Sequence, residues 1–238
     1  MAKQNGFFRS WFGAALDAVF PSHCLGCGIA LAGGALICEF CLAEIPVFKK
    51  LFCAICKARL PENKKICHRD APYLLGAATD YHDEWVRQLV HNLKFKFLKP
   101  AAQPLASLLV AYAKEALPSL EGFVVVPIPL SRARERERGF NQSALIGKIF
   151  SAHFSMEFLT ELLVRERHTK AQSEINDFSK RHENVAGCFS VLCPDLVKGK
   201  NLIVIDDVTT SGATFFEAAV TLKRAGAKKI ICLAAAKS

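Results

Sequence analysis

The sequence predicts an α/β domain with a mostly parallel sheet flanked by helices, preceded by a small cysteine-rich module. Seven of the ten cysteines lie between Cys24 and Cys67, whereas the rest of the chain alternates between helical and strand patterns. The length of 238 residues suits one large domain, or one medium domain with a small appendage. Hydrophobic residues make up 51% of the chain, which is typical of a globular protein. We therefore expect a metal-binding module over residues 1–72 and the α/β domain over residues 73–238.

Apolar residues at helical or strand spacing define the elements of the expected α/β domain. Helices are predicted where apolar side chains recur at i, i+3, i+4 and i+7, and buried strands where short apolar runs end in loops. In the predicted helix 141–154, the apolar face holds Leu145, Ile149 and Ala152. The expected order is helix 86–93, helix 105–112, strand 123–126, helix 141–154, strand 202–205, helix 215–222 and strand 230–235.

The charge of the chain favours anionic partners. The formal net charge is +9, which suits nucleic acid or phosphorylated metabolites, although a basic surface that only aids solubility fits the charge equally well. No apolar run reaches the roughly 18 residues of a membrane span. Residues 1–20 lack a long apolar stretch with a small-residue cleavage site. We expect a cytoplasmic protein without a membrane span.

The first four cysteines have the spacing of a zinc site. A Cys-x2-Cys turn places two thiolates on one knuckle, and two facing knuckles complete a tetrahedral four-sulfur shell. A disulfide framework is the alternative, but it is disfavoured because the chain carries no export signal and the cytosol keeps thiols reduced. We expect structural Zn²⁺ on Cys24, Cys27, Cys38 and Cys41.

A second set of cysteines repeats this spacing but lacks one ligand. Cys53, Cys56 and Cys67 match the first set, and the fourth position falls on Asp70. His68 is chemically the better fourth ligand, although adjacent residues chelate one ion awkwardly. The sequence leaves open whether this second site is occupied, weak or lost.

The chemistry of the α/β domain is concentrated in residues 202–214. An apolar strand delivers Asp206 and Asp207 to the carboxyl edge of a parallel sheet, where ligands bind in such folds. A helix then opens with a run of hydroxyl-bearing and glycine residues whose N–H groups can cradle a phosphate. Two adjacent acids can bind ribose hydroxyls or orient a Mg²⁺ ion. Together these features predict a site for a ribose 5-phosphate.

The same segment resembles the signature of type I phosphoribosyltransferases, which is an apolar strand, two acids and a TTGxT-like loop. Further blocks resemble ComF-type proteins: Val126-Pro-Ile-Pro-Leu130 with Arg138-Gly-Phe-Asn-Gln-Ser143, Thr169-x-x-Gln172 with Arg181-x-x-Asn184-x-Ala186-x-x-Phe189, and Tyr81 with Leu93-Lys-Phe-Lys96. The resemblance covers nearly the whole chain, including the paired zinc ribbons. It departs from the family in the missing cysteine of the second ribbon and in a small offset after Ala186.

The resemblance implies a protein that binds phosphoribosyl pyrophosphate (PRPP) with Mg²⁺. Asp206 and Asp207 would be the catalytic acids on the ribose hydroxyls, and the loop from Pro127 to Ser131 would contact pyrophosphate. Residues 165–184 would form the active-site loop, whose Arg165 and Lys170 have the charge to bind pyrophosphate. The family also implies a role in natural competence, with internalised single-stranded DNA and DNA-uptake proteins as partners. The 5-phosphate would be held by Thr209, Thr210, Ser211, Gly212, Ala213 and Thr214.

A basic stretch beside two phenylalanines is the candidate nucleic-acid surface. Backbone-tracking cations interleaved with stacking rings are typical of single-strand binders. The alternative is a half-buried strand in which Phe95 and Phe97 belong to the core. Three functions stay open: a PRPP-binding nucleic-acid protein, an active phosphoribosyltransferase of nucleotide metabolism, and a non-catalytic scaffold. The candidate cations are Arg87, Lys94, Lys96 and Lys99.

Overall fold

The domain is built on one five-stranded sheet. The computed structural model describes residues 22–61, 67–166 and 186–238. The strand order is β3-β4-β9-β8-β5, in which β3 is antiparallel to β4 and the other three pairings are parallel. This arrangement confirms the expected mostly parallel sheet. The strands are β3 (Phe52–Cys53), β4 (Leu74–Asp80), β5 (Phe123–Pro127), β8 (Asn201–Thr209) and β9 (Lys229–Lys237).

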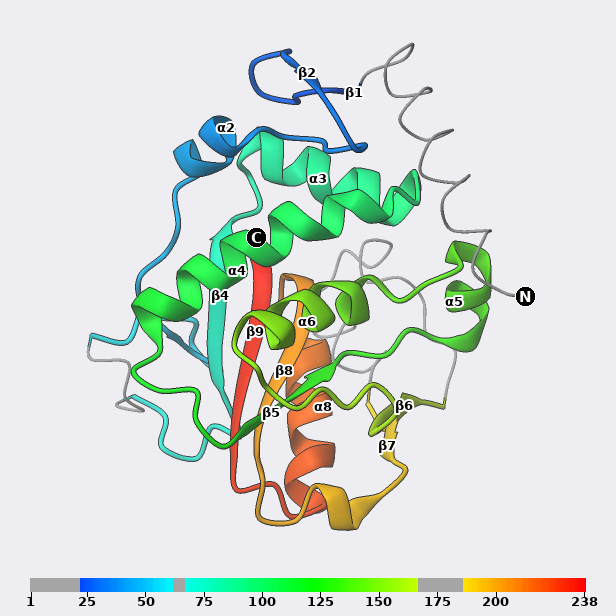
Figure 1. Ribbon diagram of the computed structural model, residues 1–238. Helices are drawn as coiled ribbons and strands as arrows, with labels where there is room; N and C mark the ends of the chain where they lie inside the picture. The colour runs from blue at the N-terminus through cyan, green and yellow to red at the C-terminus, as the bar shows by residue number, and fades with distance from the viewer. Residues whose placement is uncertain (1–21, 62–66, 167–185) are drawn as a thin grey trace.

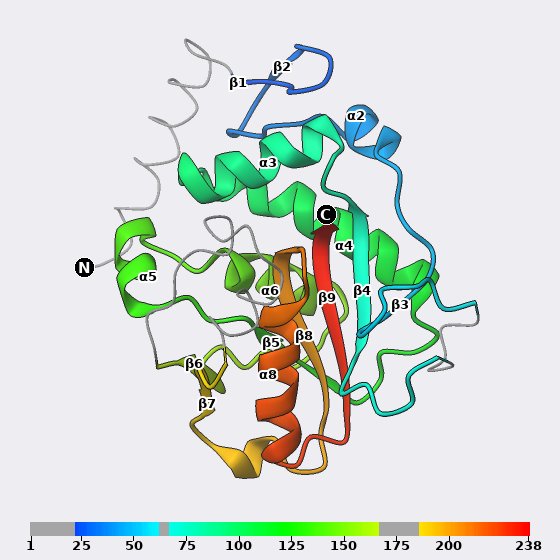
Figure 2. The same cartoon turned by 180° about the vertical axis from the view of Figure 1, so that it is seen from behind.

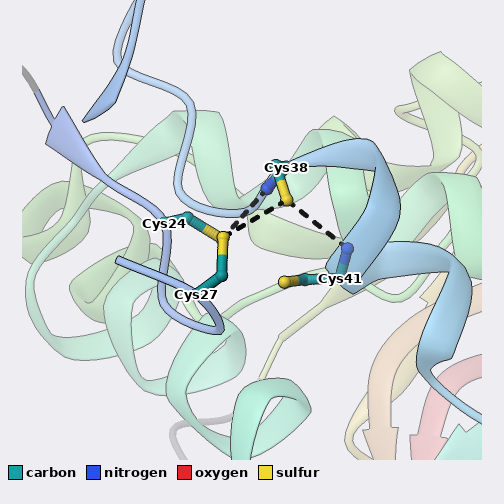
Figure 3. A group of neighbouring side chains, drawn as sticks. All are labelled: Cys24, Cys27, Cys38 and Cys41. Carbon is teal, nitrogen blue, oxygen red and sulfur yellow. Dashed lines mark hydrogen bonds between the residues drawn. The ribbon is translucent and has the colours of Figure 1, made fainter. Parts of the chain in front are cut away.

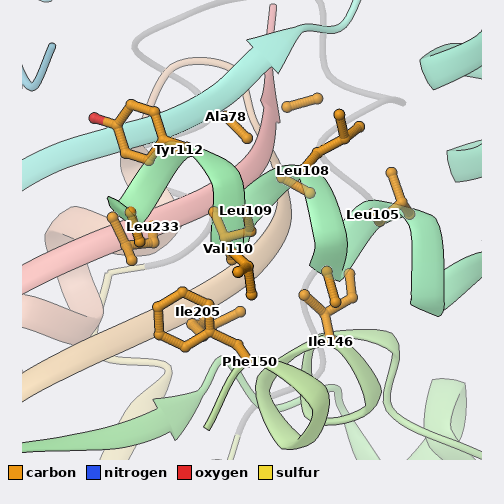
Figure 4. Close-up of a cluster of buried hydrophobic side chains, with 14 of the residues drawn as sticks. Ala78, Leu105, Leu108, Leu109, Val110, Tyr112, Ile146, Phe150, Ile205 and Leu233 are labelled. Carbon is orange, nitrogen blue, oxygen red and sulfur yellow. The ribbon is translucent and has the colours of Figure 1, made fainter. Parts of the chain in front are cut away.

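Helices cover both faces of this sheet, because its strands are apolar on both sides. On β8, Ile203 and Ile205 belong to the core that includes residues of α4 and α6, whereas Leu202 and Val204 belong to the core under α8. Figures 1 and 2 show α8 on the face opposite to α4 and α6, and Figure 4 shows the first of these cores. The helices are α3 (Glu84–Phe95), α4 (Ala102–Ala116), α6 (Gln142–His153) and α8 (Ala213–Arg224).

All four expected helices and three expected strands are present, with two differences. In α6 the buried face is centred on Ile146 and Phe150; Leu145 and Ile149 are partly buried and pack against the core as expected, whereas Ala152 is exposed, so the prediction is wrong for Ala152. Strand β4 was not expected, and it lies between β3 and β9. Shorter elements complete the described chain: η1 (Lys99–Ala101), α5 (Arg132–Arg138), β6 (Leu163–Arg165), β7 (Phe189–Val191) and η3 (Pro194–Leu196). No helix among the described residues has the length and apolar character needed to cross a membrane.

The cysteine-rich part is joined to the sheet. Its first half contains β1 (Ser22–His23), β2 (Ala30–Leu31) and α2 (Glu39–Glu44), and its second half contributes β3 as an edge strand of the main sheet. The hydroxyl of Tyr112 on α4 donates to the Lys50 carbonyl at 3.0 Å, and the Phe48 N–H donates to the Ala78 carbonyl at 2.7 Å. The main sheet therefore contains strands from both sides of residue 72. The domain boundary expected at residue 72 stays a prediction.

Candidate functional site

The first four cysteines form a compact ligand cluster. The sulfur atoms of Cys24, Cys27, Cys38 and Cys41 lie within 4.8 Å of one another, and those of Cys27 and Cys38 are 3.8 Å apart (Figure 3). A tetrahedral zinc with Zn–S bonds of 2.3 Å requires sulfur separations of about 3.8 Å. Burial raises the pKa of the Cys24 thiol, but backbone N–H groups that include those of Cys38 and Gly26 outweigh it and lower the pKa to about 6. The cluster fits structural zinc.

The second cluster is completed by His68. The Cys53 sulfur lies 3.4 Å from His68 Nδ1, and the sulfurs of Cys56 and Cys67 are 3.7 Å apart. All four ligand atoms fall within 4.8 Å of one another, and Asp70 is not among them. Burial raises the pKa of Cys53, but the N–H groups of Cys56 and Ile55 overcome this and lower it to about 6. The chain thus carries two four-ligand sites, one with four sulfurs and one with three sulfurs and an imidazole.

The two acids lie near the carboxyl end of β8 and are held by groups from two helices. The Ser143 hydroxyl at the start of α6 donates to Asp206 Oδ1 at 2.7 Å, and the Asp207 N–H donates to the same oxygen at 2.9 Å. From the last turn of α3, the Lys94 ammonium lies 2.8 Å from Asp207 Oδ2. The Asp207 side chain is only 2% exposed, so this ion pair compensates a carboxylate that is almost out of water.

Asp206 has a strongly raised pKa. Loss of water around its carboxyl group and the negative charge of Asp207 raise the pKa to about 7, against the opposing effects of Lys94 and the Ser143 hydroxyl. Such a carboxyl group gains or loses its proton near neutral pH. The acid pair therefore contains one group, the Asp206 carboxyl, whose charge depends on pH near neutrality.

The loop that follows β8 turns sharply into α8. Gly212 is the N-cap of α8 and has φ of +79°, a conformation that favours glycine. Gly212 itself has no side chain to cap the helix, and the Ser211 hydroxyl oxygen accepts the Ala213 N–H at 3.3 Å. A helix N-terminus with a glycine at its entrance suits an anion. The structure thus places the predicted phosphate loop, Thr209 to Thr214, directly beside the acid pair.

Comparisons with known proteins agree with this architecture. Residues 15–70 match the family model of the double zinc ribbon domain. Competence protein F of Haemophilus influenzae is 25% identical over 224 residues, covering 87% of this chain and 92% of that protein. The DNA utilization protein YhgH of Escherichia coli K12 is 30% identical over 219 residues, covering 88% of this chain and 94% of that protein. The chain belongs to the ComF family.

Further matches concern the α/β domain of this ComF-family chain. Competence protein ComFC of Bacillus subtilis is 37% identical over 108 residues, which is 44% of this chain and 40% of that protein. Among solved structures, the glutamine PRPP amidotransferase of B. subtilis aligns over 58% of this chain and 26% of its own, with 17% identity and a TM-score of 0.39. The fold of the domain is defined by its mostly parallel sheet. At the site, strand β8 carries the acid pair and is followed by the phosphate loop and then by α8.

The remaining predicted ligand-binding residues of the ComF-family site occupy several elements. Pro127 is the last residue of β5 and pairs with Ile205, and Ser131 is buried as the N-cap of α5. Arg165 ends β6, where its guanidinium lies 5.5 Å from the centre of the Phe189 ring. Lys170 lies outside the described residues, as do most of the other residues of the predicted active-site loop.

The end of α3 corrects the expected nucleic-acid surface. Phe95 is 61% exposed and Phe97 is 43% exposed, so the alternative of a half-buried strand with core phenylalanines is wrong. Lys94 is tied to Asp207 in the acid-pair site, since its ammonium has a buried carboxylate as partner. The candidate surface therefore consists of the two exposed rings and three exposed cations, Arg87, Lys96 and Lys99.

Four contacts of the site were not identified from the sequence. Ser143 lies inside a recognised ComF block, Arg138 to Ser143, which signals its importance without assigning it a contact with Asp206. Lys94 belongs to another recognised block, but its charge suggested nucleic acid. Lys57 and Tyr73 approach Gly212 from the cysteine-rich part and the start of β4, and no local motif marks either.

Proposed function

We propose that this ComF-family protein binds PRPP with Mg²⁺ and handles single-stranded DNA in the cytoplasm, alongside other DNA-uptake proteins. The observation that carries the PRPP assignment is the junction of β8 and α8. Two carboxylates precede a helix start whose entrance is a glycine in the left-handed conformation. A ribose 5-phosphate needs hydrogen-bond acceptors for its hydroxyl groups and N–H donors for its phosphate, spaced by the ribose ring. The junction supplies both in adjacent residues.

Each group at the junction has a defined part in the proposed binding. Asp206 and Asp207 accept hydrogen bonds from the ribose hydroxyls, and the N–H groups of the loop Thr209 to Thr214 donate to the 5-phosphate. Lys94 lowers the negative charge of the acid pair, which otherwise repels the pyrophosphate group. Mg²⁺ bound with PRPP supplies charge neutralisation of the pyrophosphate oxygens.

Calorimetry with PRPP and Mg²⁺ tests this assignment. The double variant Asp206→Asn, Asp207→Asn should lose ribose recognition, so PRPP affinity should fall by at least about 100-fold, as two charge-assisted hydrogen-bonding groups are lost. Binding of inorganic phosphate to the loop should persist. Asp195→Asn in η3, an exposed acid outside the site, is the matched control and should bind PRPP like the wild type. Equal or tighter PRPP binding by the double variant would falsify the assignment.

The single-strand proposal rests on the exposed end of α3 and on the names of the relatives, which include a DNA utilization protein and competence proteins. Exposed rings beside exposed cations allow bases to stack while phosphates are neutralised. Affinity for single-stranded DNA should fall with salt, with a logarithmic slope of about −0.7 per phosphate contact. Lys96→Ala with Lys99→Ala should flatten this slope, whereas Lys114→Ala on α4 should not. A salt-independent signal, or a preference for duplex, contradicts the proposal.

Pentosyl transfer is a second candidate function, and the pKa of Asp206 favours it. A carboxyl group that titrates near 7 is suited to accept a proton from a nucleophile at neutral pH. Pyrophosphate release from PRPP, measured with and without free bases and single-stranded DNA, decides between transfer and binding alone. Release that requires both an acceptor and Asp206 identifies an enzyme, and no release with intact PRPP binding identifies a binding protein.

A further inference from the structure

Lys57 is fixed by the turn that builds the second metal cluster. It directly follows Cys56, and its N–H donates to the Cys53 carbonyl at 3.0 Å, which closes the knuckle. Its φ is +60°, an uncommon conformation for a residue with a side chain. The Ala58 carbonyl accepts the Cys53 N–H at 2.8 Å and extends the same turn. The backbone position of Lys57 therefore depends on the geometry of the knuckle.

The side chain of Lys57 reaches the phosphate loop. A Cβ atom placed on Gly212 would lie 2.5 Å from Lys57 Nζ and 3.2 Å from the Tyr73 hydroxyl oxygen. The Tyr73 hydroxyl itself donates to the Gly212 carbonyl at 3.4 Å. Two polar groups, one from the cysteine-rich part and one from the residue before β4, thus converge on the glycine at the entrance of α8, and a side chain at this position would displace the Lys57 ammonium.

The ammonium group of Lys57 has no carboxylate partner among the described residues. It has three N–H donors and is partly buried, and its hydrogen-bond partner is the Ala54 carbonyl. Within residues 22–61, 67–166 and 186–238, no carboxylate forms an ion pair with it. It also lies at the N-terminal end of α8, where the helix dipole is positive. A cation placed there is stabilised by an anion, and a phosphate at the loop is such an anion.

We propose that Lys57 binds the phosphate group held by the loop Thr209 to Thr214, and that the second metal cluster sets the affinity of this loop for phosphate monoesters by positioning Lys57. This inference rests on the proposed function in one respect, the identity of PRPP as the ligand. The coupling runs through the chain itself. A metal ion on Cys53, Cys56, Cys67 and His68 fixes the knuckle, the knuckle fixes the Lys57 backbone, and the side chain ends at Gly212.

Calorimetry on the full-length protein, with PRPP and Mg²⁺ and separately with inorganic phosphate, tests the role of Lys57. Lys57→Met removes the charge and should weaken both ligands about 10- to 100-fold, the usual value of one charge-assisted hydrogen bond. Lys57→Arg keeps the charge and should retain most of the affinity. Lys49→Met, an exposed lysine of the same module, is the matched control and should bind like the wild type. Zinc content and thermal unfolding of all variants should match the wild type.

A second variant tests the coupling to the metal. Cys67→Ser, at an exposed ligand, should lower the zinc content by one equivalent and weaken phosphate binding by a factor similar to that of Lys57→Met. Combining the two changes should weaken binding little further, because both act through Lys57.

The outcomes separate this inference from the proposed function. Wild-type binding of PRPP that Lys57→Met leaves unchanged overturns the inference alone. Wild-type binding of inorganic phosphate but not PRPP, lost in Lys57→Met, supports the inference and overturns the PRPP assignment. If Lys57→Met loses phosphate binding but the zinc-depleted Cys67→Ser keeps full affinity, the coupling to the metal cluster is overturned. If the wild type binds neither PRPP nor inorganic phosphate, both proposals are overturned.

Discussion

The two metal clusters share the spacing of their first three ligands but lie in different surroundings. The first packs on α3, where a Cβ on Gly26 would lie 3.1 Å from the Trp85 ring, and it contributes Cys24 and Cys41 to the main core, to which the second contributes Cys53. The second is attached through β3 to the edge of the sheet and sends Lys57 to the phosphate loop. The first cluster thus supports helix α3, whereas the second cluster holds the side chain of Lys57 at the phosphate loop.

This difference links each cluster to one half of the candidate site. The helix under the first cluster carries Lys94 in its last turn, where it pairs with Asp207, whereas the turn of the second cluster carries Lys57 to Gly212. Lys94 has a carboxylate partner, and Lys57 has a carbonyl. We therefore expect the first cluster to act mainly on stability and the second mainly on ligand binding.

The largest expected effect comes from breaking each cluster in turn. Cys41→Ser removes a buried ligand of the first cluster, and the free energy of a structural zinc site is folding free energy. This variant should lose one zinc and several kcal/mol of stability, lowering the melting temperature by about 10 °C or more. Cys56→Ser removes an exposed ligand of the second cluster and should lose one zinc with a smaller fall, because the pairing of β3 with β4 remains.

Elemental analysis and thermal unfolding measure both quantities. Cys193→Ser changes an exposed cysteine outside both clusters and should leave zinc content and melting temperature unchanged. Equal destabilisation by Cys41→Ser and Cys56→Ser would show that the two clusters do not differ in the way proposed.

The comparison also shows what sequence reasoning can reach. The helices α3 and α8 were predictable because their buried residues recur at helical spacing, and the acid pair and phosphate loop were predictable because they are contiguous. Strand β4 was missed because its sequence, Leu-Leu-Gly-Ala-Ala-Thr-Asp, has no run of β-branched residues. Its small residues are required by packing, since a Cβ on Gly76 would lie 2.5 Å from Leu233 and 2.8 Å from Tyr112.

Contacts between distant residues could not be found in the same way. Ser143 and Asp206 are 63 residues apart, and Tyr73 and Gly212 are 139 apart. Nothing local in the sequence distinguishes Lys94 from Lys96, and only the rotation of α3 decides which one points to Asp207 and which to solvent. The sequence could therefore identify the ligand-binding loop, but not the side chains that reach it from other elements.

Replacing Lys94 tests the acid pair, which is the part of the site next to the helix that the first cluster supports. Lys94→Met leaves the buried Asp207 carboxylate without its cation, which should cost about 1–3 kcal/mol, less than for a fully buried pair because Lys94 is 24% exposed. Asp207→Asn in the same background should recover most of this loss. Urea unfolding measures it.

An exposed ion pair provides the matched control for Lys94. Lys200 and Glu157 lie 4.0 Å apart with side chains 49% and 53% exposed, so Lys200→Met should cost no more than about 0.5 kcal/mol. Equal effects of Lys94→Met and Lys200→Met would mean that the Lys94–Asp207 pair is no stronger than a surface pair.

The smallest expected effect is a pH dependence of PRPP affinity that arises from Asp206 in the acid pair. The pKa of Asp206 is raised from 3.8 to about 7, with Asp207 and Lys94 beside it and Arg138 and Arg165 farther away. Below pH 7 the carboxyl group is protonated and accepts hydrogen bonds weakly. The ionised fraction falls about tenfold between pH 8 and pH 6, so PRPP affinity should fall by up to about tenfold over this range.

A variant separates this effect from the titration of the ligand. The phosphate groups of PRPP also take up protons near pH 6, so the pH profile of Asp206→Asn is the reference and should be flatter than that of the wild type by the Asp206 contribution. The effect on stability has the opposite sign. Between about pH 4 and 7 the folded protein holds a proton on Asp206 that the unfolded chain has lost, so the Asp206 contribution to stability is complete below pH 4 and declines as pH rises to 7. If wild type and Asp206→Asn show the same pH profile for PRPP binding, then Asp206 does not contact the ribose in its ionised form.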